Sequence, residues 1–257
     1  MANDEEIKPP KPQNDSFDDY WTAIWRKHFE HKTWQNVPFY PIEAHLFRVI
    51  LETVEFNDSN SKYYRLDPFE RSKLRELIRG DVYKQLNETL STLHSEEDDT
   101  LSLKERLYFA ITCCMWSNKM DLNFKPGKSE QLHNVHTDEN DQLLLHDDRD
   151  KIVAFFMRKL AEQNTENARS VSMVCDNSGA EFLNDLMCCD FLLKHGFADR
   201  VHLHVKLYPT YVSDVTLRDV DRHLSHLYVQ SLNEQLSSLH AFYQRLAGYM
   251  RQERMVV

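Results

Sequence analysis

The sequence predicts a mixed α/β fold, in which an N-terminal helical layer is followed by a Rossmann-like α/β/α domain with a parallel sheet. Two observations support this prediction. Apolar residues recur at helical spacing along residues 15–125. Farther along, a strand pattern, a helical pattern and a second strand pattern follow one another at the spacing of a right-handed βαβ unit.

Shifts in composition divide the chain into four segments. Residues 1–14 are acidic and rich in proline, which is typical of a disordered tail. Residues 15–125 form the helical region, and residues 126–150 are polar and acidic without a sustained period, which predicts a long surface loop. Residues 151–257 carry the α/β pattern. We expect the segments after the tail to form one continuous globular unit.

Helix start signals mark the elements of the helical region. A polar residue that can cap a helix stands just before an apolar stripe, and an acidic residue in the first turn can close a capping box. The signals lie at Ser16 with Asp19, at Pro41, at Asp67 with Glu70, and at Ser102 with Glu105. Each of them predicts one helix.

The α/β region begins with the two-residue period of a strand. Ser170–Asp176 is a short apolar, β-branched run. A turn at Asn177–Gly179 follows it, and then a helix that stops at Gly196, a residue suited to a left-handed cap. Val201–Tyr208 alternates apolar and polar residues and predicts a second strand. The chain from Thr216 onward predicts two further helices.

The composition excludes several classes of protein. The chain has 257 residues, with 31 Lys and Arg against 41 Asp and Glu, and the resulting net charge of −10 argues against binding of nucleic acid. No apolar run approaches the ~20 residues that a membrane span needs, and the N-terminus is unlike a signal peptide. We therefore expect a protein of the cytoplasm, with the nucleus as a second location, and reduced thiols at its five cysteines.

The five glycines exclude the common phosphate-binding loops. They stand at Gly80, Gly127, Gly179, Gly196 and Gly248, too far apart for a dinucleotide fingerprint, a Walker-type loop or a hydrolase nucleophile elbow. A small anionic ligand would then need another source of positive charge, and a metal ion is the obvious one.

Polar side chains follow the two predicted strands at the point where each strand ends. Asp176 and Asn177 come directly after the first strand, and Asp214 follows the second. Ligands of open parallel sheets bind beyond the carboxyl ends of the strands, and carboxylate and amide oxygens are the ligands that Mg²⁺ and Mn²⁺ prefer. The three residues therefore predict a divalent-metal site. On spacing alone a second interpretation stays open, in which Asp176 and Asn177 only cap the following helix.

Several motifs occur in one order from about Phe17 to the C-terminus. They are Pro41–Arg48, Asp67-Pro68-Phe69, Trp116–Leu122, Asp176–Glu181 with Asp185, His204-Val205-Lys206, and Val212–Thr216. Together they resemble the damage-control phosphatase family, in the subfamily also called acidic residue methyltransferase-like or sugar phosphate phosphatase. The resemblance favours the metal-site interpretation of Asp176 and Asn177.

The resemblance implies a metal-dependent phosphatase that hydrolyses phosphate esters of small metabolites, such as fructose 1-phosphate and related sugar phosphates. Asp176, Asn177 and Asp214 would bind the metal, with Mn²⁺ preferred and Mg²⁺, Co²⁺ or Ni²⁺ as substitutes. Asp176 and Asn177 would also contact the substrate, together with Asn118 and Asp121. Either a metal-bound water or Asp176 itself, the expected catalytic residue, would attack phosphorus.

The sequence also departs from this subfamily. Its members continue past the point where this chain stops, with a Lys-Gly-Asp-x-Asn-Tyr stretch and a terminal Arg-Thr-x-Lys motif that hold the phosphate and the sugar. Neither motif occurs in the chain. We therefore expect a C-terminally truncated form with the metal half of the site and without the cationic half. The parallel sheet would then be incomplete at its C-terminal edge, and the exposed strand edge would favour association.

Two other functions stay open beside the phosphatase. The subfamily's other name implies an S-adenosylmethionine-dependent protein carboxyl methyltransferase, with Glu181 and Asp214 at the cofactor. The missing glycine-rich loop weakens that interpretation, because the common Rossmann-type methyltransferases use one. The second alternative is a catalytically impaired remnant that only binds metal or partners.

Overall fold

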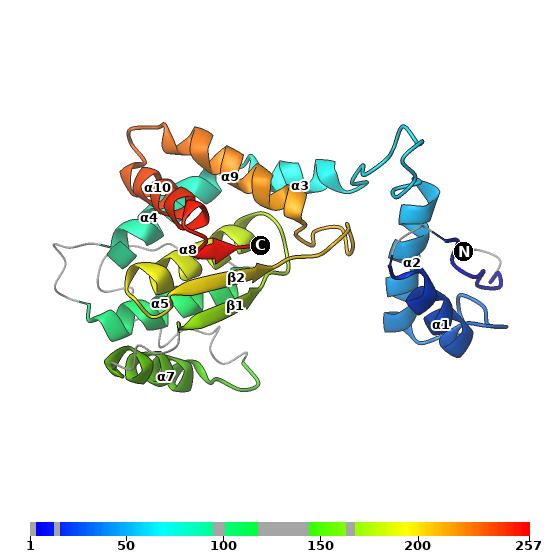
Figure 1. Ribbon diagram of the computed structural model, residues 1–257, viewed down its shortest axis with the longest axis horizontal. Coiled ribbons are helices and arrows are strands. Elements are labelled where there is room, and N and C mark those ends of the chain that lie inside the picture. Colours follow the sequence, from blue (N-terminus) through cyan, green and yellow to red (C-terminus); the bar gives the residue numbers. More distant parts are fainter. Residues whose placement is uncertain (1–3, 13–15, 95–100, 118–143, 163–167) are drawn as a thin grey trace. The chain divides into compact units, whose positions relative to one another are not determined.

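The computed structural model describes residues 4–12, 16–94, 101–117, 144–162 and 168–257 (Figure 1). The described residues confirm the predicted fold class, since they form nine helices and a three-stranded parallel sheet. They divide into two compact units. The N-terminal unit comprises Met1–Lys73 with Tyr208–Asp214, and the α/β unit comprises Leu74–Leu207 with Val215–Val257.

The N-terminal unit holds helices α1 (Asp18–His28) and α2 (Phe39–Thr53) and the beginning of α3 (Glu70–Leu77). Its small core is built on three buried side chains, Ile7, Phe29 and Ile42. Residues 4–12, which the sequence assigns to a disordered tail, contribute to this core. Ile7 is fully buried, and its N–H donates to the carbonyl of Lys32 at 2.9 Å. One apolar residue in a polar segment gives no period, so the sequence pattern could not show this packing.

The predicted helix start signals differ in outcome. Ser102 and Glu105 form the predicted capping box at the start of α5. The box at Ser16 is wrong, because α1 begins after Phe17 without a side-chain cap. Asp67 accepts from the N–H of Phe69 at 2.7 Å, and α3 begins at Glu70.

The sheet of the α/β unit runs in the order β1 (Ser170–Val174), β2 (Arg200–His204) and β3 (Met255–Val256), all parallel. The first two strands confirm the predicted βαβ unit, although β2 is shorter than expected. The sequence pattern missed β3, since two residues are too few for a strand period.

Helices surround this sheet and fill the core of the unit (Figure 1). They are α4 (Gly80–His94), α5 (Leu103–Trp116), α7 (Arg149–Ala161), α8 (Ala180–Lys194), α9 (Leu217–Ser231) and α10 (Ser237–Arg251). Helix α8 connects β1 to β2 and packs against α4, α5 and α10, so most of its residues are buried. The cysteines are free, as predicted, and all but Cys114 are buried. No helix among the described residues is long and apolar enough to cross a membrane.

A buried ion pair joins the far end of α8 to α10. The Asp190 side chain is fully buried and accepts from the guanidinium of Arg245 at 2.6 and 2.8 Å. Nε2 of His94, on α4, lies 3.1 Å from the same carboxylate. Burial raises the pKa of Asp190, but the hydrogen bonds from Arg245 and His94 outweigh it and hold that pKa below its ordinary value. Asp190 is therefore a charged residue that links helices α4, α8 and α10.

Candidate functional site at the carboxyl edge of the sheet

The turn after β1 leaves the sheet at its carboxyl edge. The N–H of Cys175 donates to the carbonyl of His204 at 2.9 Å, which continues the β1–β2 ladder by one residue. Beyond this bond, Val215 joins the two segments. Its N–H donates to the carbonyl of Asp176 at 2.8 Å, and its carbonyl accepts from the backbone N–H of Lys206 at 2.9 Å. These backbone bonds bring Asp176 and Lys206 to the same edge.

The Asp176 side chain points into accessible space. Its exposed fraction is 63%, and its Oδ1 lies 3.6 Å from Nζ of Lys206, which is 39% exposed. An exposed ion pair at this distance adds little to stability. The ion pair therefore lies where a small charged ligand can reach it, and it contributes little to the stability of the fold.

Glu181, in the first turn of α8, orients the neighbouring amide. Its carboxylate accepts from the backbone N–H of Asn177 at 3.4 Å and from Nδ2 of Asn177 at 3.1 Å. The same Nδ2 lies 3.3 Å from Oδ2 of Asp176. Because carboxylates only accept hydrogen bonds, the amide nitrogen must face them, and the planar amide turns its carbonyl oxygen away from Glu181. Asn177 thus presents the atom that a hard cation binds.

Gly179 closes this turn in a conformation that favours glycine. Its φ is +87°, and a Cβ at this position would lie 3.0 Å from Oε2 of Glu76. Glycine therefore satisfies both a left-handed backbone and a close approach of α3.

A third carboxyl group lies behind the turn. Asp185 follows Glu181 by one helical turn on α8, is buried, and accepts from Sγ of Cys114 at 3.0 Å. Burial is the main cause that raises its pKa to about 7, and the negative charges of Glu181 and Asp176 add to this effect. The group is therefore half protonated near neutral pH.

Replacing Asp185 with asparagine is expected to change how stability depends on pH. The folded chain binds the Asp185 proton with a pKa of about 7, against 3.8 as the ordinary value. The folded state thus holds more protons, so this contribution to stability is complete below the lower pKa and is lost as the pH rises through the higher one. The asparagine variant has no such loss.

The measurement is urea unfolding of both proteins in EDTA across this pH range. The free energy of unfolding of D185N, relative to wild type, should rise by up to roughly 4 kcal/mol from about pH 4 to about pH 8. A difference that stays constant with pH would contradict a raised pKa at this carboxyl group.

The structure brings together three of the residues that the sequence selects, Asp176, Asn177 and Glu181. Asp214 is buried, belongs to the N-terminal unit and directly precedes Val215 in the chain. Its place beside the other two ligands stays a prediction. Asn118 and Asp121 lie outside the described residues.

Asp176 and Asn177 fit a divalent cation by their chemistry, since they offer hard carboxylate and amide oxygens from consecutive positions. Within the described ranges, no three His, Cys, Asp or Glu side chains gather to hold an ion. The turn thus offers two oxygen-bearing side chains suited to a cation, and a metal site there, with Asp214 as its third ligand, stays a prediction.

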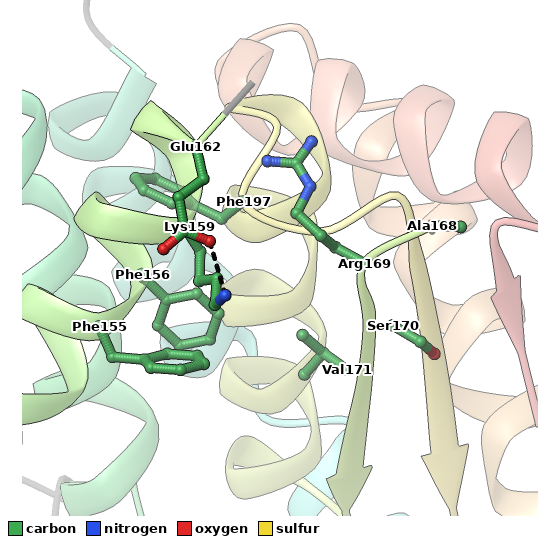
Figure 2. A pocket seen from close by; sticks show the side chains of 9 residues that line it. All are labelled: Phe155, Phe156, Lys159, Glu162, Ala168, Arg169, Ser170, Val171 and Phe197. Atoms are coloured by element: carbon green, nitrogen blue, oxygen red, sulfur yellow. Dashed lines mark hydrogen bonds and ion pairs between the residues drawn. The ribbon is translucent and has the colours of Figure 1, made fainter. Parts of the chain in front are cut away.

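A separate cavity of about 370 Å³ opens at the opposite edge of the sheet (Figure 2). Phe155 and Phe156 of α7 line it, together with Ser170 and Val171 at the start of β1. Its cations are held in ion pairs, Lys159 with Glu162 at 2.6 Å and Arg169 with Asp199 at 3.2 Å. It lies at the amino ends of the strands, so it is distinct from the Asp176 turn.

The fold is that of an α/β protein with a parallel sheet, and proteins of this class commonly bind ligands where the strands end. The chain belongs to the family of the damage-control phosphatase ARMT1-like domain, which matches residues 6–256. This confirms the resemblance seen in the motifs.

Curated relatives agree with this membership. The chain is 27% identical over 231 residues to the human damage-control phosphatase ARMT1, an alignment that covers 82% of this chain and 51% of the relative. It is 25% identical over 234 residues to the Xenopus laevis protein of that name, covering 82% of this chain and 51% of the relative, and 25% identical over 256 residues to the mouse protein, covering 93% and 57%. The chain thus spans about half the length of the curated relatives that it matches.

Proposed function

We propose that the chain is a metal-dependent phosphatase that hydrolyses phosphate esters of small metabolites, with sugar phosphates such as fructose 1-phosphate as the substrate class and Mn²⁺ as the preferred ion. The observation that carries the proposal is the Asp176–Asn177 turn, which presents a carboxylate and an oriented amide at the carboxyl edge of the sheet. Membership in a damage-control phosphatase family supports the reaction type.

Each residue of the turn has a part in this proposal. Asp176 and Asn177 hold the cation through Oδ atoms, and Asp214 is its third ligand. A divalent cation supplies, when bound, Lewis acidity toward a phosphoryl oxygen and neutralises negative charge. Lys206, paired with Asp176 at 3.6 Å, attracts the phosphate dianion. Asn118 and Asp121 contact the substrate.

The proposal leaves the nucleophile open between a water molecule and the Asp176 carboxylate. Either attack forms a P–O bond and releases the alcohol of the ester. With Asp176, a second step would return the carboxylate and free phosphate by hydrolysis.

The test is phosphate release by the purified chain from fructose 1-phosphate and from p-nitrophenyl phosphate. We expect release with Mn²⁺, loss of release in EDTA, and recovery when Mn²⁺ is restored. Parallel reactions with Mg²⁺, Co²⁺ and Ni²⁺ rank the ions. No release from either ester with any of the four ions, by protein shown to be folded, would contradict the proposal.

A second arm of the same experiment tests the methyltransferase alternative. The chain is incubated with labelled S-adenosylmethionine and a protein that bears carboxylates. Formation of base-labile methyl esters would favour the alternative, and we expect none.

A further inference from the structure

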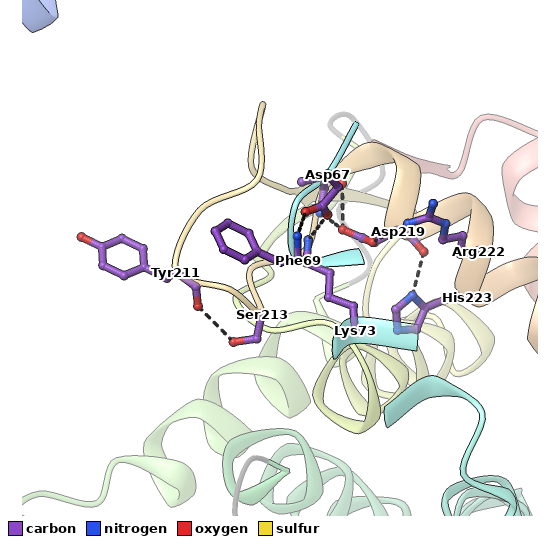
Figure 3. A network of polar contacts seen from close by, with 9 residues as sticks. Asp67, Phe69, Lys73, Tyr211, Ser213, Asp219, Arg222 and His223 are labelled. Atoms are coloured by element: carbon purple, nitrogen blue, oxygen red, sulfur yellow. Dashed lines mark hydrogen bonds and ion pairs between the residues drawn. The ribbon is translucent and has the colours of Figure 1, made fainter. Parts of the chain in front are cut away.

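A buried histidine on α9 contacts the backbone of the turn at Gly179. His223 is 2% exposed, and its Nε2 lies 2.7 Å from the backbone nitrogen of Gly179. Its Nδ1 lies 2.7 Å from the carbonyl oxygen of Asp219, one helical turn earlier (Figure 3). The ring also meets Phe182 edge-on at 5.0 Å. Three contacts thus fix the ring in position and in plane.

The two hydrogen bonds define the protonation state of the ring. The Gly179 N–H can only donate, so Nε2 must accept. The Asp219 carbonyl can only accept, so Nδ1 must carry the hydrogen. The imidazole is therefore neutral, in the Nδ1–H tautomer. Burial agrees with this assignment, because it lowers the pKa of His223 to about 4.

This hydrogen bond anchors the end of the turn that holds the candidate ligands. Glu181 secures Asn177 from within α8, whereas His223 secures Gly179 from a different helix. Glycine accepts a wide range of backbone conformations, so a hydrogen bond to its N–H restricts this turn. Without that bond, a change in the Gly179 backbone would shift the preceding residues, Asp176 and Asn177, relative to each other.

We propose that His223 is a positioning residue of the metal site, which holds the Gly179 N–H so that Asp176 and Asn177 present their oxygens to one cation. The inference rests on the proposed function, since it assumes that this turn binds a divalent ion. Groups that orient ligands from behind commonly change metal affinity by about 10- to 100-fold when they are replaced.

The test compares side chains that differ in the reach of their acceptor. In H223Q the side-chain oxygen stands near the place of Nε2, so it can accept from Gly179. In H223N the oxygen is too short to reach, although the residue is equally polar. H223L removes the acceptor and fills the buried space with an apolar side chain. H226L, farther along the same helix, is the matched control.

The readout is the Kd for Mn²⁺, measured from the electron paramagnetic resonance signal of the free ion. We expect H223N and H223L to raise the Kd at least about tenfold. H223Q and H226L should stay within about threefold of the wild type, since glutamine restores the acceptor and His226 is not part of the contact. Thermal unfolding of each variant identifies those that are folded at the temperature of the titration.

A spectroscopic signature complements the affinities without any metal. In the wild type, ¹⁵N shifts of the His223 ring should show the Nδ1–H tautomer, and the Gly179 amide should exchange slowly with solvent. Exchange should accelerate in H223N and not in H223Q.

Equal Mn²⁺ affinity of folded H223N and wild type would overturn the inference. Equal losses in H223N and H223Q would also overturn it, because they would show that the ring acts by its shape alone. If the wild type binds no Mn²⁺, the proposed function itself fails and the inference fails with it. The wild-type titration thus separates the two failures.

Discussion

Replacing Asp176 with asparagine is expected to abolish Mn²⁺-dependent phosphate release while leaving the fold intact. The part of Asp176 that supports the sheet is its backbone carbonyl, which accepts from Val215 in any variant. Its carboxylate is 63% exposed and pairs only loosely with Lys206. The substitution therefore removes a charge from the edge of the sheet with little cost to stability.

The expected effect on activity is large because one carboxylate serves both the cation and the phosphate. Loss of the charge weakens binding of the cation. It therefore lowers the Lewis acidity that acts on the phosphate ester. We expect the rate of phosphate release from p-nitrophenyl phosphate to fall at least about 100-fold in D176N, with an unchanged unfolding curve. Raising the Mn²⁺ concentration should recover only part of the loss.

Asp199 offers a matched control at the opposite edge. It is 46% exposed and pairs with Arg169 at 3.2 Å, so D199N removes a similar surface charge far from the turn. We expect D199N to retain wild-type activity. If D176N kept activity within a few-fold of D199N, the assignment of Asp176 to the site would be wrong.

The second large effect concerns stability. Replacing Asp190 with alanine should lower the free energy of unfolding by about 3–5 kcal/mol, because it leaves Arg245 without its buried partner. The loss combines the uncompensated charge of the guanidinium with a small cavity between α8 and α10. For a domain whose total stability is of the order of 5–15 kcal/mol, such a change is severe.

Urea unfolding of D190A measures this loss, and an exposed pair provides the comparison. Glu162 accepts from Lys159 at 2.6 Å at the surface of α7. E162A should lower the free energy of unfolding far less than D190A, although its ion pair is as short as that of Asp190. Similar losses in the two variants would mean that burial does not govern how much these ion pairs contribute to the free energy of unfolding.

The sequence predicted the parts of the fold that depend on local pattern. Strands β1 and β2 with α8 between them follow from a change of period, and the capping box at Ser102 follows from two residues that interact within one helical turn. The pattern also selected Asp176 and Asn177, and the resemblance added Glu181; these residues follow one another closely in the chain and so meet through a single turn.

The parts that the sequence did not predict depend on contacts between distant residues. His223 meets Gly179 through the packing of α9 on the turn, and no spacing in the sequence reports that approach. Ile7 is a lone apolar residue whose burial depends on Phe29. At Ser16 the local pattern favoured a capping box, but the chain adopts helical geometry only after Phe17, so Ser16 does not cap α1.

Helix α8 begins at the candidate site and carries the Asp190 ion pair in its last turns, and it is buried on nearly all sides between these points. A helix so enclosed exposes its backbone only when the whole unit unfolds, so it belongs to the slowest-opening part of the structure. The turn that presents Asp176 and Asn177 is thus attached to the element that opens last. A ligand arriving there would meet groups already in place, and little of its binding free energy would be spent on ordering them.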